Sequence, residues 1–425
     1  MKNIYCFTPV GGAGKRLLPL THGMSKPCIR FLNRPLIEFS IVELAEQGIR
    51  DFIFGALGHT NYSDLFDQYG EGTGVSAKYN IDPRIHIKYQ PNLDDLGSAH
   101  SFFLNIEYYD VRDPVLIIQG DSIFNVDISD FLTKHEERNA FMSIALVHVE
   151  NTAEYGVAEL SGDMKIRRFI EKPPHNEAPS NLASTGIYLL SPEVRALFKD
   201  KKLLEIMEKR NRLDFGYDLI PYLIEQGYPV FGYLIEIWYD IGTPARYLQA
   251  MRDILNGRLD IKITEEKILP HHNIWVQGFS EDSVRRRNEI IRKYKQGHLF
   301  LEGADLIGRH TSIGNHTRIS ESCIDNFCII GDNVHVERSA ILDGCKIGNN
   351  TIITDSILGR SVIIESSEKK PTCIEANSVV GNSCKIREGC WLVSTKVNPN
   401  LILPKGMNYV GKTLQTYEDV AQLSS

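Results

Sequence analysis

The chain has 425 residues, enough for two or three domains that each bury a core of their own. Its formal net charge of -7 argues against a broad nucleic-acid-binding surface, and it has no run of about 18 apolar residues that could span a membrane. Because the N-terminus leads straight into a strand without a charged and apolar leader, we expect a cytoplasmic protein. The eight cysteines include no C-x-x-C pair, which disfavours disulfides and zinc.

Residues 1–255 alternate short apolar strands with helical stretches, a pattern typical of a Rossmann-like, mostly parallel sheet covered on both faces. The clearest expected strands are 4–10, 51–56, 85–89 and 115–119. A helix is expected at 35–47, where apolar residues recur at helical spacing and Gly48 provides a C-terminal stop. Ligands of open α/β sheets bind at the carboxyl edge of the strands, so functional residues are expected at that edge.

A glycine-rich loop after the first expected strand has the composition of a phosphate cradle. Gly11, Gly12 and Gly14 would let bare backbone N–H groups point at an anion before a helix begins, and Arg16 and Lys26 add two positive charges. The loop is not a P-loop, which needs a hydroxyl residue at position 16, nor a dinucleotide fingerprint, which needs a glycine at position 17. The alternative is an ordinary turn with two solvated cations, and matching groups downstream favour the cradle.

Two aspartates each follow an apolar, strand-like run. Asp121 comes after the run 115–119, and Asp240 comes after a second such run late in the same region. The parallel-sheet interpretation places both near one edge, although a helix cap is the alternative for Asp121 alone. Mg²⁺ is typically held by one or two carboxylates together with substrate oxygens and water, so the pair predicts a magnesium site.

Further short stretches complete a set suited to joining two phosphates. Small residues at 96–99, among them Gly97 and Ser98, would let a planar base approach the backbone at a strand end. Glu171 and Lys172 form a second charged pair. A sugar phosphate approaches a nucleoside triphosphate against like-charge repulsion, which cations and a metal must offset. No Ser-His-Asp arrangement is needed, because the incoming phosphate oxygen is already a nucleophile.

The C-terminal third carries a six-residue period that predicts a parallel β-helix over 301–411. The loop expected to interrupt one coil is rich in Ser, Glu and Lys and lies at 365–372. A connecting segment at 256–300 contains Arg285, Arg286 and Arg287 on an expected helical face, and a tail covers 412–425. The aliphatic residues that hold the phase of the repeat, and should form its core, are Ile307, Ile313, Ile319, Ile330, Val336, Ile347, Ile353, Val380 and Ile386.

These motifs together resemble the sugar-1-phosphate nucleotidylyltransferases, or nucleotide-sugar pyrophosphorylases, that carry a C-terminal left-handed β-helix. The family loop G-G-x-G-T-R-L with a following K-P pair is matched at Gly11, Gly12, Gly14, Arg16, Leu17, Lys26 and Pro27, whereas Lys15 stands where the family usually has threonine. The second half of the catalytic region is most similar to ADP-glucose pyrophosphorylases, on the motifs at 171–173, 180–188, 214–221 and 240–243. Gln90 is similar to the glutamine that thymidylyl- and uridylyltransferases place on the base, so the nucleobase stays open.

The resemblance implies roles for individual residues. Arg16 would hold the pyrophosphate leaving group, Lys26 the nucleotide phosphates, and Asp121 and Asp240 the Mg²⁺. Residues implied at the nucleotide are Gly11, Gly12, Gly14, Arg16, Gln90, Gly97 and Ser98. At the sugar, Glu171 would bind hydroxyls, Lys172 the phosphate, and the pocket would be lined by Gly156, Ser184 and Tyr188. The implied catalytic residues are Arg16, Lys26, Asp121 and Lys172.

The expected reaction is transfer of a nucleotidyl group from a nucleoside triphosphate to a hexose 1-phosphate, with glucose 1-phosphate as the first candidate, and release of pyrophosphate. The β-helix is expected to build a homo-oligomer. Two alternatives stay open. The β-helix could acetylate amino sugars with a histidine base such as His310, His316 or His335, or the chain could be a non-catalytic regulatory homologue.

Overall fold

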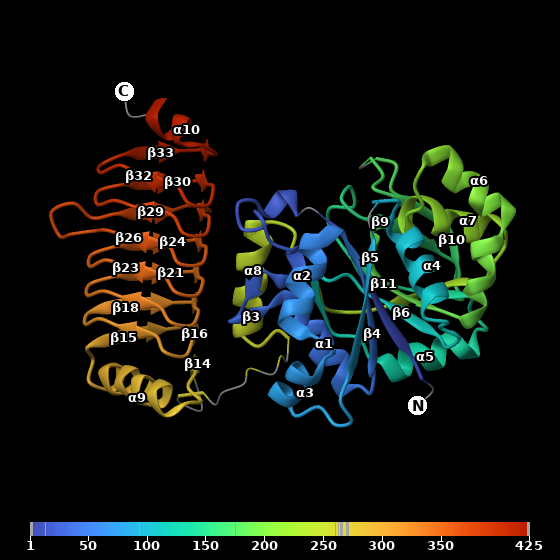
Figure 1. The fold of residues 1–425 in the computed structure, drawn as a ribbon, viewed down its shortest axis with the longest axis horizontal. Coiled ribbons are helices and arrows are strands. Elements are labelled where there is room, and N and C mark those ends of the chain that lie inside the picture. The colour runs from blue at the N-terminus through green and yellow to red at the C-terminus, as the bar shows by residue number, and fades with distance from the viewer. Residues whose placement is uncertain are drawn as a thin grey trace. The chain divides into compact units, whose positions relative to one another are not determined.

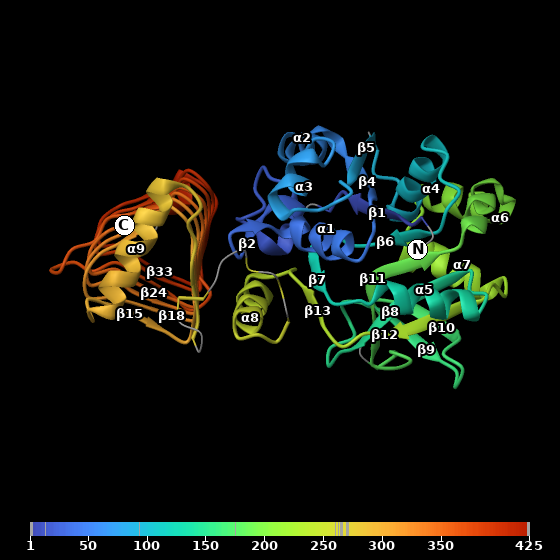
Figure 2. The same cartoon turned by 90° about the horizontal axis from the view of Figure 1, so that it is seen from below.

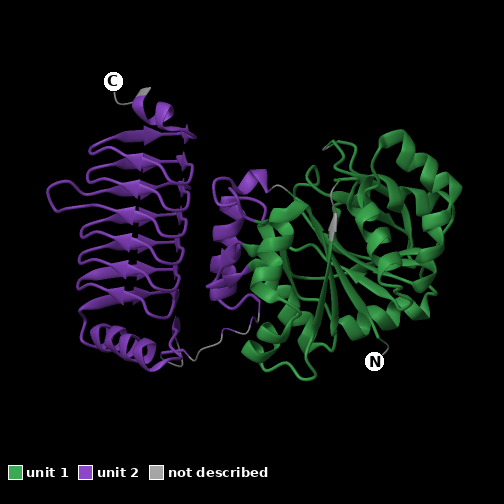
Figure 3. Ribbon diagram, viewed as in Figure 1, with its two compact units in different colours: residues 1–12, 25–28, 36–240 green, residues 13–24, 29–35, 241–425 purple. Residues whose placement is uncertain are grey.

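The computed structural model describes residues 3–12, 14–92, 94–174, 176–259, 261, 263, 267–268 and 272–422. The chain divides into two compact units (Figure 3). The first unit comprises Met1–Gly12, Ser25–Cys28 and Leu36–Asp240, and the second comprises Ala13–Met24, Ile29–Pro35 and Ile241–Ser425. Two short N-terminal segments thus group with the C-terminal half, and the domain limits expected at 255 and 300 stay a prediction.

A mixed sheet forms the centre of the first unit, with strands in the order β10-β9-β11-β6-β1-β4-β5 and with β8 joining β11 to β12 (Figure 1). The strands β6, β1, β4 and β5 are parallel neighbours, with Phe7 opposite both Ile53 and Ile117. This arrangement confirms the expected Rossmann-like sheet. The strands are β1 (Tyr5–Val10), β4 (Asp51–Leu57), β5 (His86–Asn92), β6 (Val115–Ile117), β8 (Met142–His148), β9 (Gly156–Leu160), β10 (Ile166–Glu171), β11 (Leu182–Leu190) and β12 (Val230–Leu234).

Helices cover both faces of the sheet. Successive residues of its central strands are therefore buried. Helix α4 packs on β1 and β4, where Phe102 and Phe103 join a core with Phe7 and Ile53. Helix α1 ends as expected before Gly48, whose φ is 96°. The helices are α1 (Leu36–Glu46), α2 (Gly58–Tyr69), α3 (Thr73–Tyr79), α4 (Ser98–Tyr108), α5 (Ile128–Glu137), α6 (Lys201–Arg210) and α7 (Ile220–Glu225), with short helices η1 (Lys15–Leu17), η2 (Lys26–Cys28), η3 (Pro192–Lys199) and η4 (Phe215–Leu219).

Two small ribbons accompany the main elements. In the first unit, β7 (Ser122–Phe124) pairs antiparallel with β13 (Trp238–Asp240). In the second unit, β2 (Arg30–Phe31) and β3 (Arg34–Pro35) form a hairpin. Within the described ranges, no helix combines the length and the apolar character needed to cross a membrane.

The second unit contains a parallel β-helix, preceded by α8 (Pro244–Leu255) and α9 (Glu281–Lys295) and followed by α10 (Tyr417–Gln422). Helix α9 packs against the first coil, across the N-terminal end of the β-helix (Figures 1 and 2). One sheet contains β14 (Asn273–Val276), β16 (Ala304–Ile307), β19 (Cys323–Ile324), β22 (Ala340–Ile341), β25 (Ile357–Leu358), β28 (Val379–Val380), β31 (Lys396–Val397) and β34 (Thr413–Leu414). A second contains β15 (Leu299–Glu302), β18 (Thr317–Ser320), β21 (His335–Glu337), β24 (Ile352–Thr354), β27 (Cys373–Glu375), β30 (Trp391–Val393) and β33 (Asn408–Val410). A third contains β17 (Ser312–Ile313), β20 (Ile329–Ile330), β23 (Lys346–Ile347), β26 (Ile363–Ile364), β29 (Lys385–Ile386) and β32 (Ile402–Leu403).

The β-helix core includes all the aliphatic residues that the repeat predicts. Ile307, Ile319 and the other aliphatic residues of the repeat belong to one buried cluster. Equivalent residues of successive coils lie 17 positions apart, as between Ser322 and Ser339, rather than the 18 or so of three strict hexads. Where the loop 365–372 leaves the coil, the offset rises to 22. This loop projects from the stack of coils in Figure 1, as expected.

A column of hydroxyl groups links the coils inside the β-helix. The Ser322 Oγ accepts a hydrogen bond from the Ser339 N–H at 3.1 Å, and the Ser339 Oγ accepts one from the Ser356 N–H at 3.1 Å. At the first coil a carboxylate replaces the hydroxyl, since Asp305 Oδ1 accepts from the Ser322 N–H at 3.0 Å. Burial raises the pKa of Asp305 well above its usual range. These hydrogen bonds satisfy amides that the coil would otherwise bury unpaired.

Candidate active site

The glycine-rich loop begins where β1 ends. A Cβ on Gly11 would lie 3.0 Å from the Leu57 Cβ, while Gly12 is exposed and has no described atom within 4 Å of that position. Gly14 has a φ of 56°, and its carbonyl accepts a hydrogen bond from the Thr21 hydroxyl at 3.0 Å. The expected helix is only the 3₁₀ turn η1, because Leu18 leaves the helical region before Pro19. Arg16 lies exposed on this turn.

Lys26 and Asp121 are ion-paired in the first unit. The Lys26 Nζ contacts Asp121 Oδ2, and the lysine is 9% exposed. Its short helix η2 is held from two sides: the Ser25 N–H donates to Asp64 Oδ2 at 2.7 Å, and Pro27 packs so closely on Gly120 that a Cβ there would lie 2.8 Å from the Pro27 Cγ. Position 120 therefore requires glycine because Pro27 packs on it, a requirement that the sequence alone does not reveal.

Asp240 is the last residue of β13, which pairs with β7. It lies opposite Ser122, the residue that directly follows Asp121. Asp121 is partly exposed and Asp240 half-buried, so the donor chemistry of the pair fits a hard divalent cation completed by substrate oxygens and water. The residues described contain no group of three or more His, Cys, Asp or Glu side chains arranged for a metal ion. Asp121 and Asp240 stay the predicted ligands of Mg²⁺, which when bound would supply charge neutralisation at the phosphates.

Glu171 lies between two glycines. It is paired with Gly156 across β10 and β9, and a Cβ on Gly156 would come within 2.6 Å of Glu171 Oε2. A Cβ on Gly216, in η4, would come within 2.2 Å of the same oxygen. Burial raises the pKa of Glu171. The charge of Asp214 raises this pKa further, and the charge of Lys172 lowers it. Only glycine therefore fits on either side of this carboxylate, whose side chain stays 18% exposed.

Lys172 has a backbone conformation that non-glycine residues rarely adopt. Its φ is 49°, and its N–H donates to the Tyr155 carbonyl at 2.9 Å. The exposed side chain lies with Nζ 3.9 Å from Glu171 Oε1 and 6.0 Å from the centre of the Tyr217 ring. This left-handed conformation brings a cation beside the half-buried carboxylate.

Ser184 and Tyr188 lie together on β11. The Ser184 Oγ is 3.4 Å from the Tyr188 hydroxyl, and both residues are buried. The Tyr188 ring packs against Phe215 with centroids 5.2 Å apart, and burial raises the Tyr188 pKa. Phe215 and Gly216 therefore connect the two halves of the predicted sugar site. The sequence motif at 214–221 marked this segment, but no local pattern showed that Gly216 faces Glu171.

The predicted base-binding segment is packed against a distant part of the chain. Gly97 has a φ of 99°, and a Cβ on it would lie 2.3 Å from the Leu213 carbonyl oxygen. The Ser98 N–H and hydroxyl both contact Asp214 Oδ1, at 3.1 and 3.3 Å. Gln90 lies on β5 opposite Gly55. Packing thus gives a reason for the small residues here, and their contact with a base stays a prediction.

The predicted site residues divide between the two units. Gly14 and Arg16 belong to the second unit, and the remaining predicted residues belong to the first. Within the first unit, the structure brings together Lys26 with Asp121, and Glu171 with Gly156 and Lys172, and it places Asp240 opposite Ser122, the residue that follows Asp121.

This fold and site define a phosphate-handling α/β domain followed by a β-helix, and comparison with known proteins gives the family. Residues 10–257 match the family model described as Nucleotidyl transferase, and residues 301–409 match that described as GMPPB C-terminal domain. The first match covers more than half of the chain, so the chain belongs to the nucleotidyl transferase family. The predicted family is confirmed.

Curated relatives are similar over most of the catalytic region. A Haloferax volcanii protein, the low-salt glycan biosynthesis nucleotidyltransferase Agl11, is 31% identical over 58% of this chain and 65% of its own length, so the chain spans just under two thirds of it. A glucose-1-phosphate adenylyltransferase of Clostridium botulinum is 30% identical over 73% of this chain and 82% of its own length. A Bacillus anthracis crystal structure, described as a glucose-1-phosphate thymidylyltransferase with sucrose, covers 61% of this chain and 98% of its own at 23% identity and a TM-score of 0.51, which supports the fold.

Proposed function

We propose that the protein transfers a nucleotidyl group from a nucleoside triphosphate to a hexose 1-phosphate, most readily glucose 1-phosphate, and releases pyrophosphate. The observation that carries this proposal is the pair of sites within one unit: Lys26 with Asp121 and Asp240, and Glu171 with Lys172. The first group suits triphosphate with a divalent cation, and the second suits a phosphorylated sugar. Relatives named as glucose-1-phosphate adenylyltransferases support the same substrate class.

The residues divide the work of an in-line displacement. Lys26 would bind the nucleotide phosphates beside Asp121, and Arg16 would bind the departing pyrophosphate. Lys172 would hold the sugar phosphate so that its oxygen faces the α-phosphorus, and Glu171 would accept hydrogen bonds from sugar hydroxyls. No protein group must remove a proton from the nucleophile, because a phosphate oxygen is already anionic. Gly156, Ser184 and Tyr188 would line the sugar pocket.

The nucleobase and the sugar are tested together. Purified protein is assayed for pyrophosphate release with Mg²⁺, crossing ATP, dTTP, UTP, GTP and CTP with the 1-phosphates of glucose, mannose, galactose and glucosamine. Release that requires both substrates is expected for one pair above the others. A folded protein that releases pyrophosphate with none of the pairs would refute the proposal. We also propose self-association through the β-helix, for which sedimentation of the full chain gives the mass.

A further inference from the structure

A strained hairpin follows the lysine of the nucleotide site. Strands β2 and β3 are joined by Leu32 and Asn33, which have φ values of 46° and 65°. Asparagine tolerates this left-handed region, but leucine rarely adopts it. Such a turn persists only where its surroundings determine it, and here Leu32 is buried.

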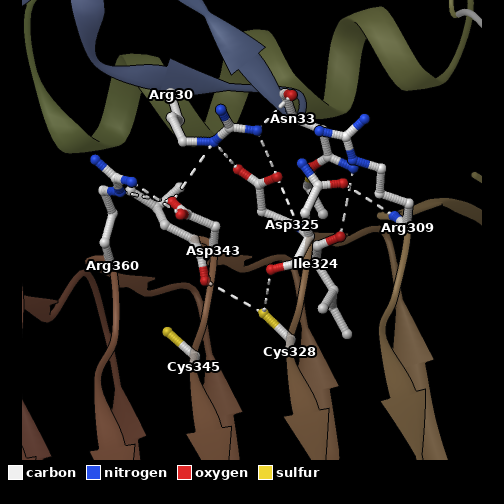
Figure 4. Close-up of polar contacts among 12 residues, drawn as sticks. Arg30, Asn33, Arg309, Ile324, Asp325, Cys328, Asp343, Cys345 and Arg360 are labelled. Atoms are coloured by element: carbon white, nitrogen blue, oxygen red, sulfur yellow. Dashed lines mark hydrogen bonds and ion pairs between the residues drawn. The ribbon is translucent and has the colours of Figure 1, made fainter. Parts of the chain in front are cut away.

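The surroundings of the hairpin are the β-helix, in the same unit. The Arg30 guanidinium makes a two-pronged contact with Asp325, with Nη2 donating to Oδ1 at 2.7 Å and Nε donating to Oδ2 (Figure 4). Asp325 is 1% exposed, and Asp343 of the next coil lies 3.6 Å from the Arg30 Nε. Fork-to-fork pairing of this kind fixes direction as well as distance, so Arg30 has one defined position on the β-helix.

Further contacts hold the rest of the hairpin. The Asn33 amide donates to Gln277 Oε1 at 3.1 Å, and the Cys323 thiol donates to Asn33 Oδ1 at 3.1 Å. From α8, the Tyr247 hydroxyl donates to the Arg30 carbonyl at 2.7 Å and its ring meets Phe31 edge-on. Asp325, with Asp343 at a greater distance, supplies the charged part of this attachment, and the contacts of Asn33 and Tyr247 are neutral.

Only three residues separate Arg30 from Lys26. A chain of that length reaches at most about 14 Å, so Arg30 and η2 are linked by a short stretch of backbone through which a displacement can pass. Within the first unit, η2 is positioned by the packing of Pro27 on Gly120 and by the hydrogen bond from Ser25 to Asp64. The lysine segment is therefore held at both of its ends.

We propose that Asp325, in the β-helix, is a positioning residue for Lys26 and acts through Arg30; its effect on nucleotide rests on the proposed function. The β-helix then contributes to substrate binding indirectly, through the position of Lys26, in addition to any part in assembly. Loss of the Asp325 carboxylate frees the hairpin, and Lys26 spends less time paired with Asp121.

The first test measures Lys26 itself and needs no turnover. A short pulse of acetic anhydride on the full-length protein, followed by peptide mass spectrometry, gives the acetylation rate of each lysine. We expect Asp325→Asn to raise the rate at Lys26 at least fivefold, while Lys78 and Lys202 keep their wild-type rates. Arg318→Gln is the matched control, because Arg318 pairs with Glu302 on another face of the β-helix. An unchanged Lys26 rate, or a rise shared by all three lysines, would overturn the proposal.

The second test separates positioning from general damage. Asp325→Asn should raise the KM for the preferred nucleoside triphosphate about tenfold and leave the KM for the sugar phosphate within twofold. Arg30→Gln should do the same, and the double variant should be no worse than either single one, because both changes break one contact. Equal shifts of both KM values, or additive effects, would overturn the proposal. A wild-type protein without turnover would refute the proposed function, and acetylation would still decide the coupling.

Discussion

Replacing His135 by glutamine should flatten the acid side of the stability profile of the first unit. His135 lies at the end of α5 and is 4% exposed, with Nδ1 2.8 Å from the Ser143 hydroxyl and Nε2 2.9 Å from the Ser191 hydroxyl. Burial lowers its pKa from 6.5 to about 4. The folded chain therefore keeps the imidazole neutral, whereas the unfolded chain protonates it as the pH falls below about 6.5.

The sign and size follow from proton linkage. A group that binds protons more readily in the unfolded chain contributes stability that is complete above pH 6.5 and is lost as the pH falls towards about 4. At about 1.4 kcal/mol per pKa unit, His135 alone lowers the free energy of unfolding by about 2 kcal/mol between pH 7 and pH 5. The full loss, complete only below pH 4, is about 3 kcal/mol.

Native-state hydrogen exchange measures the effect. Peptides from α5 and β8, corrected for the intrinsic exchange rate at each pH, give the opening free energy at pH 7, 6 and 5. The decrease from pH 7 to pH 5 should be about 2 kcal/mol smaller in His135→Gln than in the wild type, whatever stability the variant loses at pH 7. His148→Gln, at an exposed histidine, controls for the substitution. An equal decrease in His135→Gln and wild type would refute the reasoning.

The remaining predictions concern the site. Asp121→Asn should lower turnover at least a hundredfold in a protein that still folds, since it removes charge and keeps shape; near-normal pyrophosphate release with Mg²⁺ would place Asp121 outside the site. Lys172→Ala should raise the KM for sugar phosphate at least tenfold and leave that for nucleotide within twofold, and equal effects would contradict its role. Gly216→Ala should weaken sugar-phosphate binding, because its Cβ would lie 2.2 Å from Glu171 Oε2. Gly74→Ala, with open space in α3, should bind normally in the same titration.

The sequence predicts elements whose signals are local. The strands at 51–57 and 86–92 and the helix ending before Gly48 follow from apolar pattern and stop residues, and the β-helix core follows from a repeated aliphatic position. The exact spacing is not predicted by a strict hexad period, because Ser322 and Ser339 lie 17 positions apart and each regular coil is therefore one residue shorter than three hexads.

Contacts between distant segments could not be predicted from one sequence. The Ser98 amide meets Asp214 across 116 residues, and Arg30 meets Asp325 across 295. No period or motif in the chain shows that either pair meets, because each contact depends on how two folded elements come together. The same applies to Gly216, whose importance depends on Glu171 being its neighbour.

The column of hydroxyl groups inside the β-helix determines by what steps the β-helix can be lengthened or shortened. In each coil the backbone N–H at this position donates to the coil before, and the side-chain oxygen accepts from the N–H of the coil after. Asp305, Ser322 and Ser339 are linked in this way. A whole coil can therefore be added or removed with its edges matched, whereas a shorter insertion must leave the stack, as residues 365–372 do. With parallel strands about 4.8 Å apart, the β-helix is a spacer whose span changes in fixed steps.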